Sequence, residues 1–151
     1  MSGRVLPLFV SGEVCRGFGR GSKELGCPTA NYSQEVVKSL PEGLDTGIYC
    51  GWASVDHGPV HKMVMSVGWN PFYNGKEKTM EIHILHEFPD QFYGAHMRVC
   101  VLKYLRPEMN FNSVDELIAQ IQDDIAKTKT ALDDPELSKF QKHQYFSEEN
   151  S

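Results

Sequence analysis

The chain has 151 residues, of which 40% are hydrophobic and 23% are charged, and its net charge is −5. This length fits one domain that buries about 68–70% of its unfolded surface, so we expect a single domain over residues 1–151 with a globular core at about 4–146. The negative charge disfavours general nucleic-acid binding, and no apolar run approaches the roughly 20 residues that cross a bilayer.

The first predicted strand covers residues 5–14, and a basic, glycine-rich stretch follows at residues 16–32. Glycine lets the backbone approach an anion closely and point its N–H groups at it. Guanidinium and ammonium groups add charge-assisted hydrogen bonds to phosphate. The residues with these properties are Gly17, Gly19, Gly21 and Gly26, together with Arg16, Arg20 and Lys23. This composition predicts a phosphate-binding loop.

Thr29 and Asn31 lie in a short extended segment at the end of this stretch. Because they are two residues apart, their side chains emerge on one face, where a hydroxyl and an amide oxygen suit a hard divalent cation. A solvated hairpin explains the same residues without a ligand. The stretch matches neither G-x-x-x-x-G-K-[ST] nor G-x-G-x-x-G before a long helix, so a nucleotide would be held with a different geometry.

Further strands are predicted after a connector, residues 33–46, that includes a brief helical turn. Three of these strands are predicted to alternate. In one, Met80, Ile82 and Ile84 share a face while Glu81 and His83 share the other. The residues predicted to share one face in the other two strands are Met63, Met65 and Val67, and Met97, Val99 and Val101. Short strands joined by turns, with no helix between them, predict an antiparallel sheet closed as a barrel. The predicted strands are residues 47–55, 60–69, 79–88 and 97–105.

A helix is predicted over residues 114–132, lying across the barrel. Ser113 and Glu116 have the spacing of a capping box at its N-terminus. Pro135 would end this helix or begin a short second one. The apolar face is predicted to hold Val114, Leu117, Ile118, Ile121 and Ile125, and the polar face Asp123, Asp124, Lys127 and Lys129.

Six stretches, in order along nearly the whole domain, match motifs of a known protein family. They are RGFGRGSKELGCPTANY (16–32), TGIYCGWASV (46–55), HKMVMSVGWNPFYN (61–74), MEIHILH (80–86), DQFYG (90–94) and YLRPEMNF (104–111). PTAN after a glycine-rich loop, GWNP, and the Glu of M-E-x-H are together very specific. In these stretches the chain resembles the riboflavin kinases, and the absence of a nucleotidyltransferase domain resembles their stand-alone eukaryotic type.

The resemblance implies a mostly β fold, a six-stranded antiparallel Greek-key barrel with a C-terminal helix packed on it. It also implies transfer of the γ-phosphate of ATP to the terminal ribityl hydroxyl of riboflavin, giving FMN and ADP. The sequence pattern predicts the barrel and the helix independently, whereas the strand order and the substrates come from the family alone.

Glu81 matches the family's catalytic position, and the resemblance implies that it is the general base. A carboxylate in that role typically contributes about 10²–10⁴-fold to the rate. A strand residue that simply faces solvent is the alternative interpretation. Thr29 and Asn31 resemble the family's Mg²⁺ ligands; because both are neutral, we expect Mg²⁺, or another divalent ion in its place, to arrive with ATP.

The resemblance also assigns the two substrates to different segments. Met109 departs from the family, which often has Lys there, so a charged contact with flavin at this position is in doubt. Arg106 would hold the FMN phosphate and Phe111 would stack on the flavin ring. The implied nucleotide residues are Gly17, Gly19, Gly21, Lys23, Thr29, Ile84, His86 and Tyr93, and the implied flavin residues are Arg106, Met109, Phe111 and Glu116.

Two other classes of function remain open at this point. A non-catalytic flavin or nucleotide-binding barrel would share the fold, although Glu81, Thr29 and Asn31 are all present. A nucleic-acid-binding barrel is disfavoured by the net charge of −5. The four scattered cysteines lack C-x-x-C spacing, so we expect reduced thiols in a cytoplasmic monomer that acts on small molecules, without nucleic-acid or membrane partners.

Overall fold

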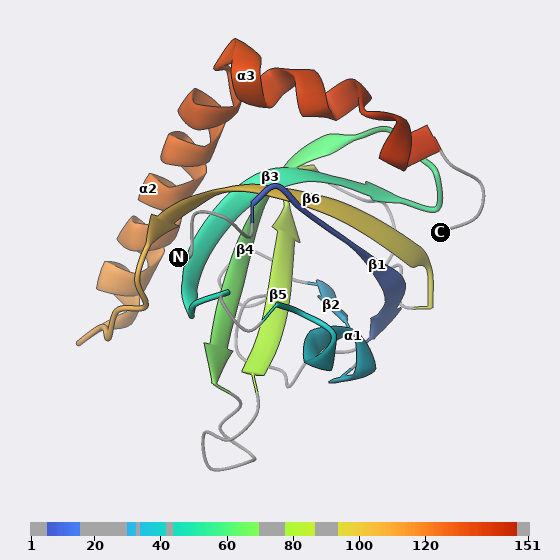
Figure 1. Ribbon diagram of the computed structural model, residues 1–151. Coiled ribbons are helices and arrows are strands. Elements are labelled where there is room, and N and C mark those ends of the chain that lie inside the picture. Colours follow the sequence, from blue (N-terminus) through green and yellow to red (C-terminus); the bar gives the residue numbers. More distant parts are fainter. Residues whose placement is uncertain are drawn as a thin grey trace.

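Antiparallel strands closed into a ring dominate the computed structural model, which describes residues 6–15, 30–32, 34–41, 44–69, 78–86 and 94–147 (Figure 1). Neighbouring strands follow the order β1-β2-β5-β4-β3-β6. The strands are β1 (Leu8–Cys15), β2 (Ala30–Tyr32), β3 (Gly47–Val55), β4 (His61–Trp69), β5 (Lys78–Ile84) and β6 (His96–Arg106). The prediction of a mostly β, antiparallel fold with a C-terminal helix is confirmed.

The interior of the barrel is filled by side chains that alternate along the strands. On β5, Met80 and Ile82 are each 1% exposed, while the intervening Glu81 faces the other way. The predicted alternation of β4, β5 and β6 is therefore confirmed. The inward residues of these strands are Met63, Met65, Val67, Met80, Ile82, Ile84, Met97, Val99 and Val101.

The β5 strand ends at Ile84, four residues earlier than predicted. The backbone N–H of His86 donates to the carbonyl of Ile84 at 2.8 Å, and the N–H of Leu85 donates to Lys62 O at 2.8 Å. A hydrogen bond between residues two apart closes a tight turn, which bends the chain out of the ladder.

All of the described helical elements except α1 lie at the C-terminal end of the chain. Ser113 caps the main helix, because its Oγ accepts from Glu116 N at 3.2 Å. In a capping box the Glu116 carboxylate would accept from the N–H of the cap residue, Ser113. Here it accepts from the N–H of the preceding residue, Asn112, at 2.9 Å. The helical elements are α1 (Gln34–Lys38), α2 (Val114–Leu132), α3 (Pro135–Ser138), η3 (Lys139–Lys142) and η4 (Gln144–Ser147).

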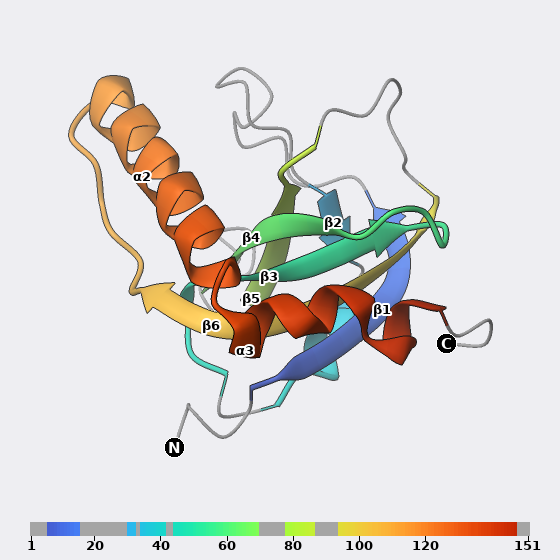
Figure 2. The same ribbon diagram turned by 90° about the horizontal axis from the view of Figure 1, so that it is seen from above.

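The predicted ends of α2 are confirmed, but its predicted apolar face is buried only in part, and Asp124 was wrongly assigned to the exposed polar face. Its buried residues are Asp124, Thr128 and Leu132, whereas Val114 and Ile118 are 60% and 37% exposed. The reason is the docking geometry: the C-terminal end of α2 lies against the barrel, while its N-terminal half projects beyond the sheet (Figure 2). None of the described helices is both long and apolar enough to cross a bilayer.

A second apolar core lies outside the barrel, between β3, β6 and the C-terminal helices. The indole N–H of Trp52 donates to Leu137 O at 3.0 Å, and Arg98 donates to the carbonyls of Tyr145 and Phe146 at 3.3 and 3.2 Å. These bonds attach the last turns to the outer wall. The buried members of this core are Cys50, Trp52, Cys100, Leu102, Leu132 and Phe146.

Candidate active site

A continuous row of paired residues crosses the outer face of the barrel from β2 to β6. Asn31 of β2 lies opposite Glu81 of β5, which lies opposite Ser66 of β4. Ser66 pairs with Ile48 of β3, and Ile48 pairs with Arg106 of β6. Directly opposed residues share one face of a sheet. The strand register therefore aligns a predicted metal ligand, the predicted base and a predicted flavin residue.

Glu81 occupies the middle of this row and is partly exposed. Its sequence neighbours Met80 and Ile82 point into the core, so the carboxylate points away from it. A solvent-facing strand residue would have the same orientation. The position of Glu81 beside Asn31, in line with Arg106, is what favours a functional carboxylate.

Most of the predicted nucleotide residues cannot be compared with the structure. Asn31 is described by its backbone alone, which pairs with Cys15 and Glu81. The residues outside the described part of the chain are Gly17, Gly19, Gly21, Lys23, Thr29 and Tyr93.

Ile84 and His86, the remaining predicted nucleotide residues, have different environments. Ile84 is 6% exposed and packs in the barrel core, so its side chain is a core residue. His86 is exposed, and its ring stacks on that of His61 with 3.9 Å between centroids and 11° between planes. Burial, with a smaller contribution from His86, lowers the pKa of His61. Near pH 7 the His61 ring is therefore neutral, and the pair offers a flat π surface.

Arg106 forms a buried, two-pronged ion pair with Asp124 of α2. Arg106 Nε donates to Asp124 Oδ1 at 2.8 Å, and Nη2 donates to Oδ2 at 2.7 Å. The two side chains are only 14% and 6% exposed. Gln120 donates to the same carboxylate at 3.1 Å. The predicted flavin arginine is thus held against the helix by a paired charge.

The connection between β6 and α2, residues 107–113, crosses the end of β4. The Glu108 carboxylate lies so close to Gly68 that a Cβ at Gly68 would collide with it. The contact joins this connection to position 68, the second residue before Asn70-Pro71 in the GWNP motif, but it does not require glycine there, because the exposed Glu108 side chain can move aside. The large apolar side chains that stay exposed in the described residues lie from the end of β6 to the start of α2: Tyr104, Met109, Val114 and Ile118. Phe111, in the same segment, is partly buried.

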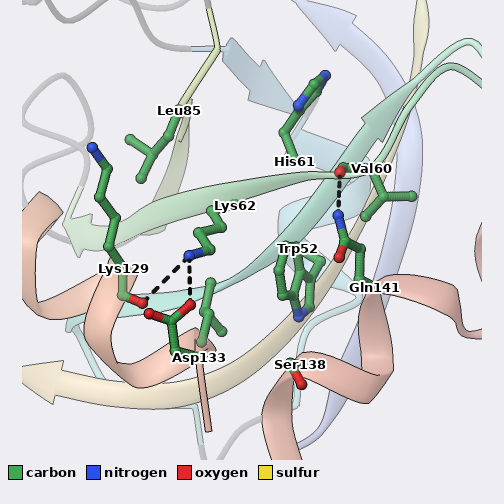
Figure 3. A pocket seen from close by; sticks show the side chains of 10 residues that line it. Trp52, Val60, His61, Lys62, Leu85, Lys129, Asp133, Ser138 and Gln141 are labelled. Atoms are coloured by element: carbon green, nitrogen blue, oxygen red, sulfur yellow. Dashed lines mark hydrogen bonds and ion pairs between the residues drawn. The ribbon is translucent and has the colours of Figure 1, made fainter. Parts of the chain in front are cut away.

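A groove of about 460 Å³ runs between the outer face of β3 and β4 and the C-terminal helices (Figure 3). Its polar side chains mostly join the barrel to those helices. Lys62 donates to Lys129 O and Asp133 at 3.4 and 3.1 Å, and Gln141 donates to Val60 O at 3.1 Å. These contacts make the groove a packing junction that lies beside the His61 ring.

Known proteins place this arrangement in one family. The family model for "Flavokinase: Riboflavin kinase" matches residues 5–132. The chain belongs to the riboflavin kinase family. It is 54% identical over 143 residues to riboflavin kinase of Mus musculus and 53% identical over 143 residues to that of Homo sapiens, in each case over 95% of this chain and 92% of the relative. The crystal structure of riboflavin kinase from Trypanosoma brucei matches with a TM-score of 0.76 at 28% identity, over 95% of this chain and 90% of that one.

Three residues at this candidate site were not predicted from the sequence to belong to it: Ser66, Glu108 and Asp124. Ser66 could have been found by extending the outward row from Glu81, but its partner depends on register, which a single strand pattern does not fix. Glu108 meets Gly68 across 40 residues of chain. Asp124 has a local signal, because Gln120, Asp124, Thr128 and Leu132 follow one another at four-residue spacing along one side of α2.

Proposed function

We infer that this chain is a riboflavin kinase that transfers the γ-phosphate of ATP to the terminal ribityl hydroxyl of riboflavin, giving FMN and ADP. The observation that supports this inference is the row from Asn31 through Glu81 to Arg106, in a chain of the riboflavin kinase family. Neighbouring strands are about 4.8 Å apart, so Glu81 and Arg106 are separated by roughly 14 Å along the sheet. An elongated substrate lying along the row would bring its terminal hydroxyl to Glu81.

Glu81 acts as the general base in this proposal. A terminal hydroxyl stays protonated near pH 7, and phosphoryl transfer needs little more than an aligned nucleophile, a neutralised triphosphate and an acceptor for the proton. Glu81 orients the hydroxyl by accepting its hydrogen bond and takes the proton as the new P–O bond forms. Its outward position between β2 and β4 leaves the carboxylate accessible to a substrate on the barrel surface.

The donors near this position fit a magnesium ion that arrives with ATP. The Asn31 backbone pairs directly with that of Glu81, and Thr29 is two residues earlier in the sequence, so this segment supplies two residues with neutral oxygen donors. Mg²⁺ takes oxygen ligands and commonly shares them with substrate phosphates. We assign Thr29 and Asn31 as its ligands; when bound, the ion would neutralise charge on the β- and γ-phosphates. Another divalent ion could replace it.

We assign the flavin to the connection between β6 and α2. Exposed Met109, Val114 and Ile118 provide apolar area that a planar ring would cover, and Phe111 is placed to stack on it. Arg106 and Glu116 provide polar groups at the same segment. Met109 carries no charge, so its contact would be apolar or through the backbone.

The nucleotide is assigned to the opposite end of the row. Gly17, Gly19, Gly21 and Lys23 would surround the phosphates, as the glycine-rich composition predicts. The adenine would lie near His86 and Tyr93, with the His61–His86 stack as a flat surface. Ile84 would contribute through its backbone, since its side chain fills the core.

At the level of the whole chain, we propose a single domain over residues 1–151 whose six strands follow the Greek-key path of the family. We further propose that the protein acts as a cytoplasmic monomer on small-molecule substrates, without nucleic-acid or membrane partners.

Incubation of the protein with ATP, riboflavin and a series of divalent ions, with FMN measured by chromatography, tests the function. Glu81→Gln should lower turnover about 100-fold or more, because it removes the proton acceptor, while ATP binding stays near normal. Glu13→Gln, an exposed acidic residue of β1, is the matched control and should leave turnover unchanged. Flavin binding without FMN formation by the wild-type protein would favour the non-catalytic module, and normal turnover by Glu81→Gln would move the base elsewhere.

A further inference from the structure

His83 is the histidine of the M-E-x-H motif that also contains Glu81. Both side chains are partly exposed, whereas Met80, Ile82 and Ile84, which alternate with them along β5, are buried in the barrel. Side chains two residues apart in a strand emerge on the same face, about 7 Å from one another along the strand. His83 therefore lies on the same outer face as Glu81, at the next outward position of β5.

The ring of His83 is neutral and keeps a hydrogen-bond donor for a ligand. Burial lowers the pKa of the ring from its ordinary value of 6.5, so near pH 7 it carries one N–H donor and no charge. Within the part of the chain that the structure describes, this ring has no hydrogen-bond or ion-pair partner. The residue opposite it on β4 is Val64, whose side chain has no polar atom. A half-buried donor of this kind calls for an explanation.

The position of His83 along β5 falls between the two ends of the proposed nucleotide site. Glu81 marks the place where the γ-phosphate is transferred, and His86, just beyond the end of β5, is assigned to the adenine. The phosphate chain that joins these two ends of ATP would therefore pass beside His83. The ladder between β5 and β2 reaches Ala30, and the residue before it in the sequence is Thr29, a proposed magnesium ligand.

We propose that His83 is a further residue of the nucleotide site, whose ring N–H donates a hydrogen bond to an oxygen of the β- or γ-phosphate of ATP. The proposal rests on the proposed function, because the direction of ATP along β5 is taken from Glu81 and His86. The bond holds the phosphate chain along the strand, so that the γ-phosphorus faces the hydroxyl at Glu81. Neutralisation of the phosphate charge stays with the magnesium ion and Lys23. A histidine that only packs on the sheet is the alternative.

His83→Phe tests this role, because phenylalanine keeps a ring of similar size and removes the donor. The dissociation constant of Mg·ATP, measured by calorimetry without riboflavin, should rise about tenfold or more, as expected for the loss of a hydrogen bond to a charged group. The inhibition constant of AMP, which lacks the β- and γ-phosphates, should not change. If both constants rise together, or if neither rises, His83 does not bind these phosphates and the proposal is overturned.

Two conservative variants separate the donor from the ring. The side-chain amide nitrogens of asparagine and glutamine reach about as far as Nδ1 and Nε2 of histidine, so either His83→Asn or His83→Gln should restore most of the Mg·ATP affinity. Failure of both to restore it would assign the loss to the ring itself and overturn the proposal. His143→Phe is the matched control, because His143 is also partly buried but stacks on Phe140 beside the outer core; neither constant should change.

Failure of this proposal can be separated from failure of the proposed function. If the wild-type protein makes FMN and His83→Phe binds Mg·ATP as tightly as the wild type does, the role of His83 is overturned and the kinase assignment stands. If the wild-type protein neither binds Mg·ATP nor makes FMN, both are overturned.

Discussion

Tyr32 shows how one hydroxyl can position a residue of the proposed site. Its Oη donates to the carbonyl of Met97 on β6 at 2.8 Å and lies 3.3 Å from that of Val10 on β1. The β2 strand is only three residues long, so few ladder hydrogen bonds hold it. Tyr32 therefore fastens β2 to two neighbours from inside the barrel, and with it the backbone of Asn31 opposite Glu81.

Tyr32→Phe should lower the free energy of unfolding by about 1–3 kcal/mol, because it leaves a buried carbonyl without its donor. Chemical denaturation of the two proteins measures the difference. Tyr104→Phe removes a hydroxyl from a side chain that is 42% exposed and should change stability by less than about 0.5 kcal/mol. Equal losses in the two variants would show that the Tyr32 hydroxyl does not fasten β2.

At the scale of elements, α2 divides into two halves with different surroundings. Its C-terminal half packs on the outer core through Leu132, which is fully buried. Its N-terminal half exposes Val114 and Ile118, four residues apart and therefore on one face. The first half thus contributes little to folding, and its apolar side chains are available to a ligand.

Ile118→Gln should change the free energy of unfolding by no more than about 0.5 kcal/mol, as expected for an exposed position, while it weakens riboflavin binding roughly fivefold through lost apolar contact. Leu132→Ala, on the same helix, should instead cost about 2–5 kcal/mol of stability and leave the affinity of the folded protein near normal. Thermal denaturation and flavin titration of both variants check the contrast, which would fail if Ile118→Gln lost stability and kept its affinity.

At the scale of the whole molecule, two apolar cores share one sheet. One core fills the barrel and the other lies between its outer wall and the C-terminal helices. Both described free thiols, Cys50 and Cys100, belong to the outer core. Burial raises the pKa of Cys50 to about 11 and that of Cys100 to about 12, above their ordinary value of 9.0.

These shifts predict a loss of stability in alkali. Below pH 9 both thiols are protonated in the folded and unfolded chains, so the free energy of unfolding does not depend on them. Between pH 9 and about 11 the unfolded chain releases protons that the folded chain keeps, and stability falls by up to about 1.4 kcal/mol per pH unit for each thiol. Denaturant midpoints at pH 8–11 measure this fall. The Cys50→Ala/Cys100→Ala variant should show a shallower slope, and an identical slope would contradict the burial argument.

Local patterns predicted much of this fold. Alternation identified the inward residues of β4, β5 and β6, and Ser113 with the apolar run after it identified both ends of α2. Periodicity predicted the buried side of α2 only in part, because the apolar residues of its first half project beyond the sheet. Asp124 is buried for a reason outside its own helix, namely the guanidinium of Arg106.

The candidate site was predictable only in part. Glu81 and Arg106 came from motif resemblance, and their alignment came from pairings between strands far apart in sequence. Ser66 and the Glu108–Gly68 contact have no local signal, because each depends on which residue of a distant segment lies opposite.

The row across β2, β5, β4, β3 and β6 has a consequence for how such a chain can change. Core residues and residues of the proposed site alternate along β5, so the pairing register of this strand decides which face both sets occupy. A single inserted residue that shifted the pairing by one would turn Met80 outward and Glu81 inward, abolishing packing and chemistry together. Insertions are therefore tolerable in the connections but not within these strands, and the proposed site depends on the spacing of the strands as much as on the carboxylate itself.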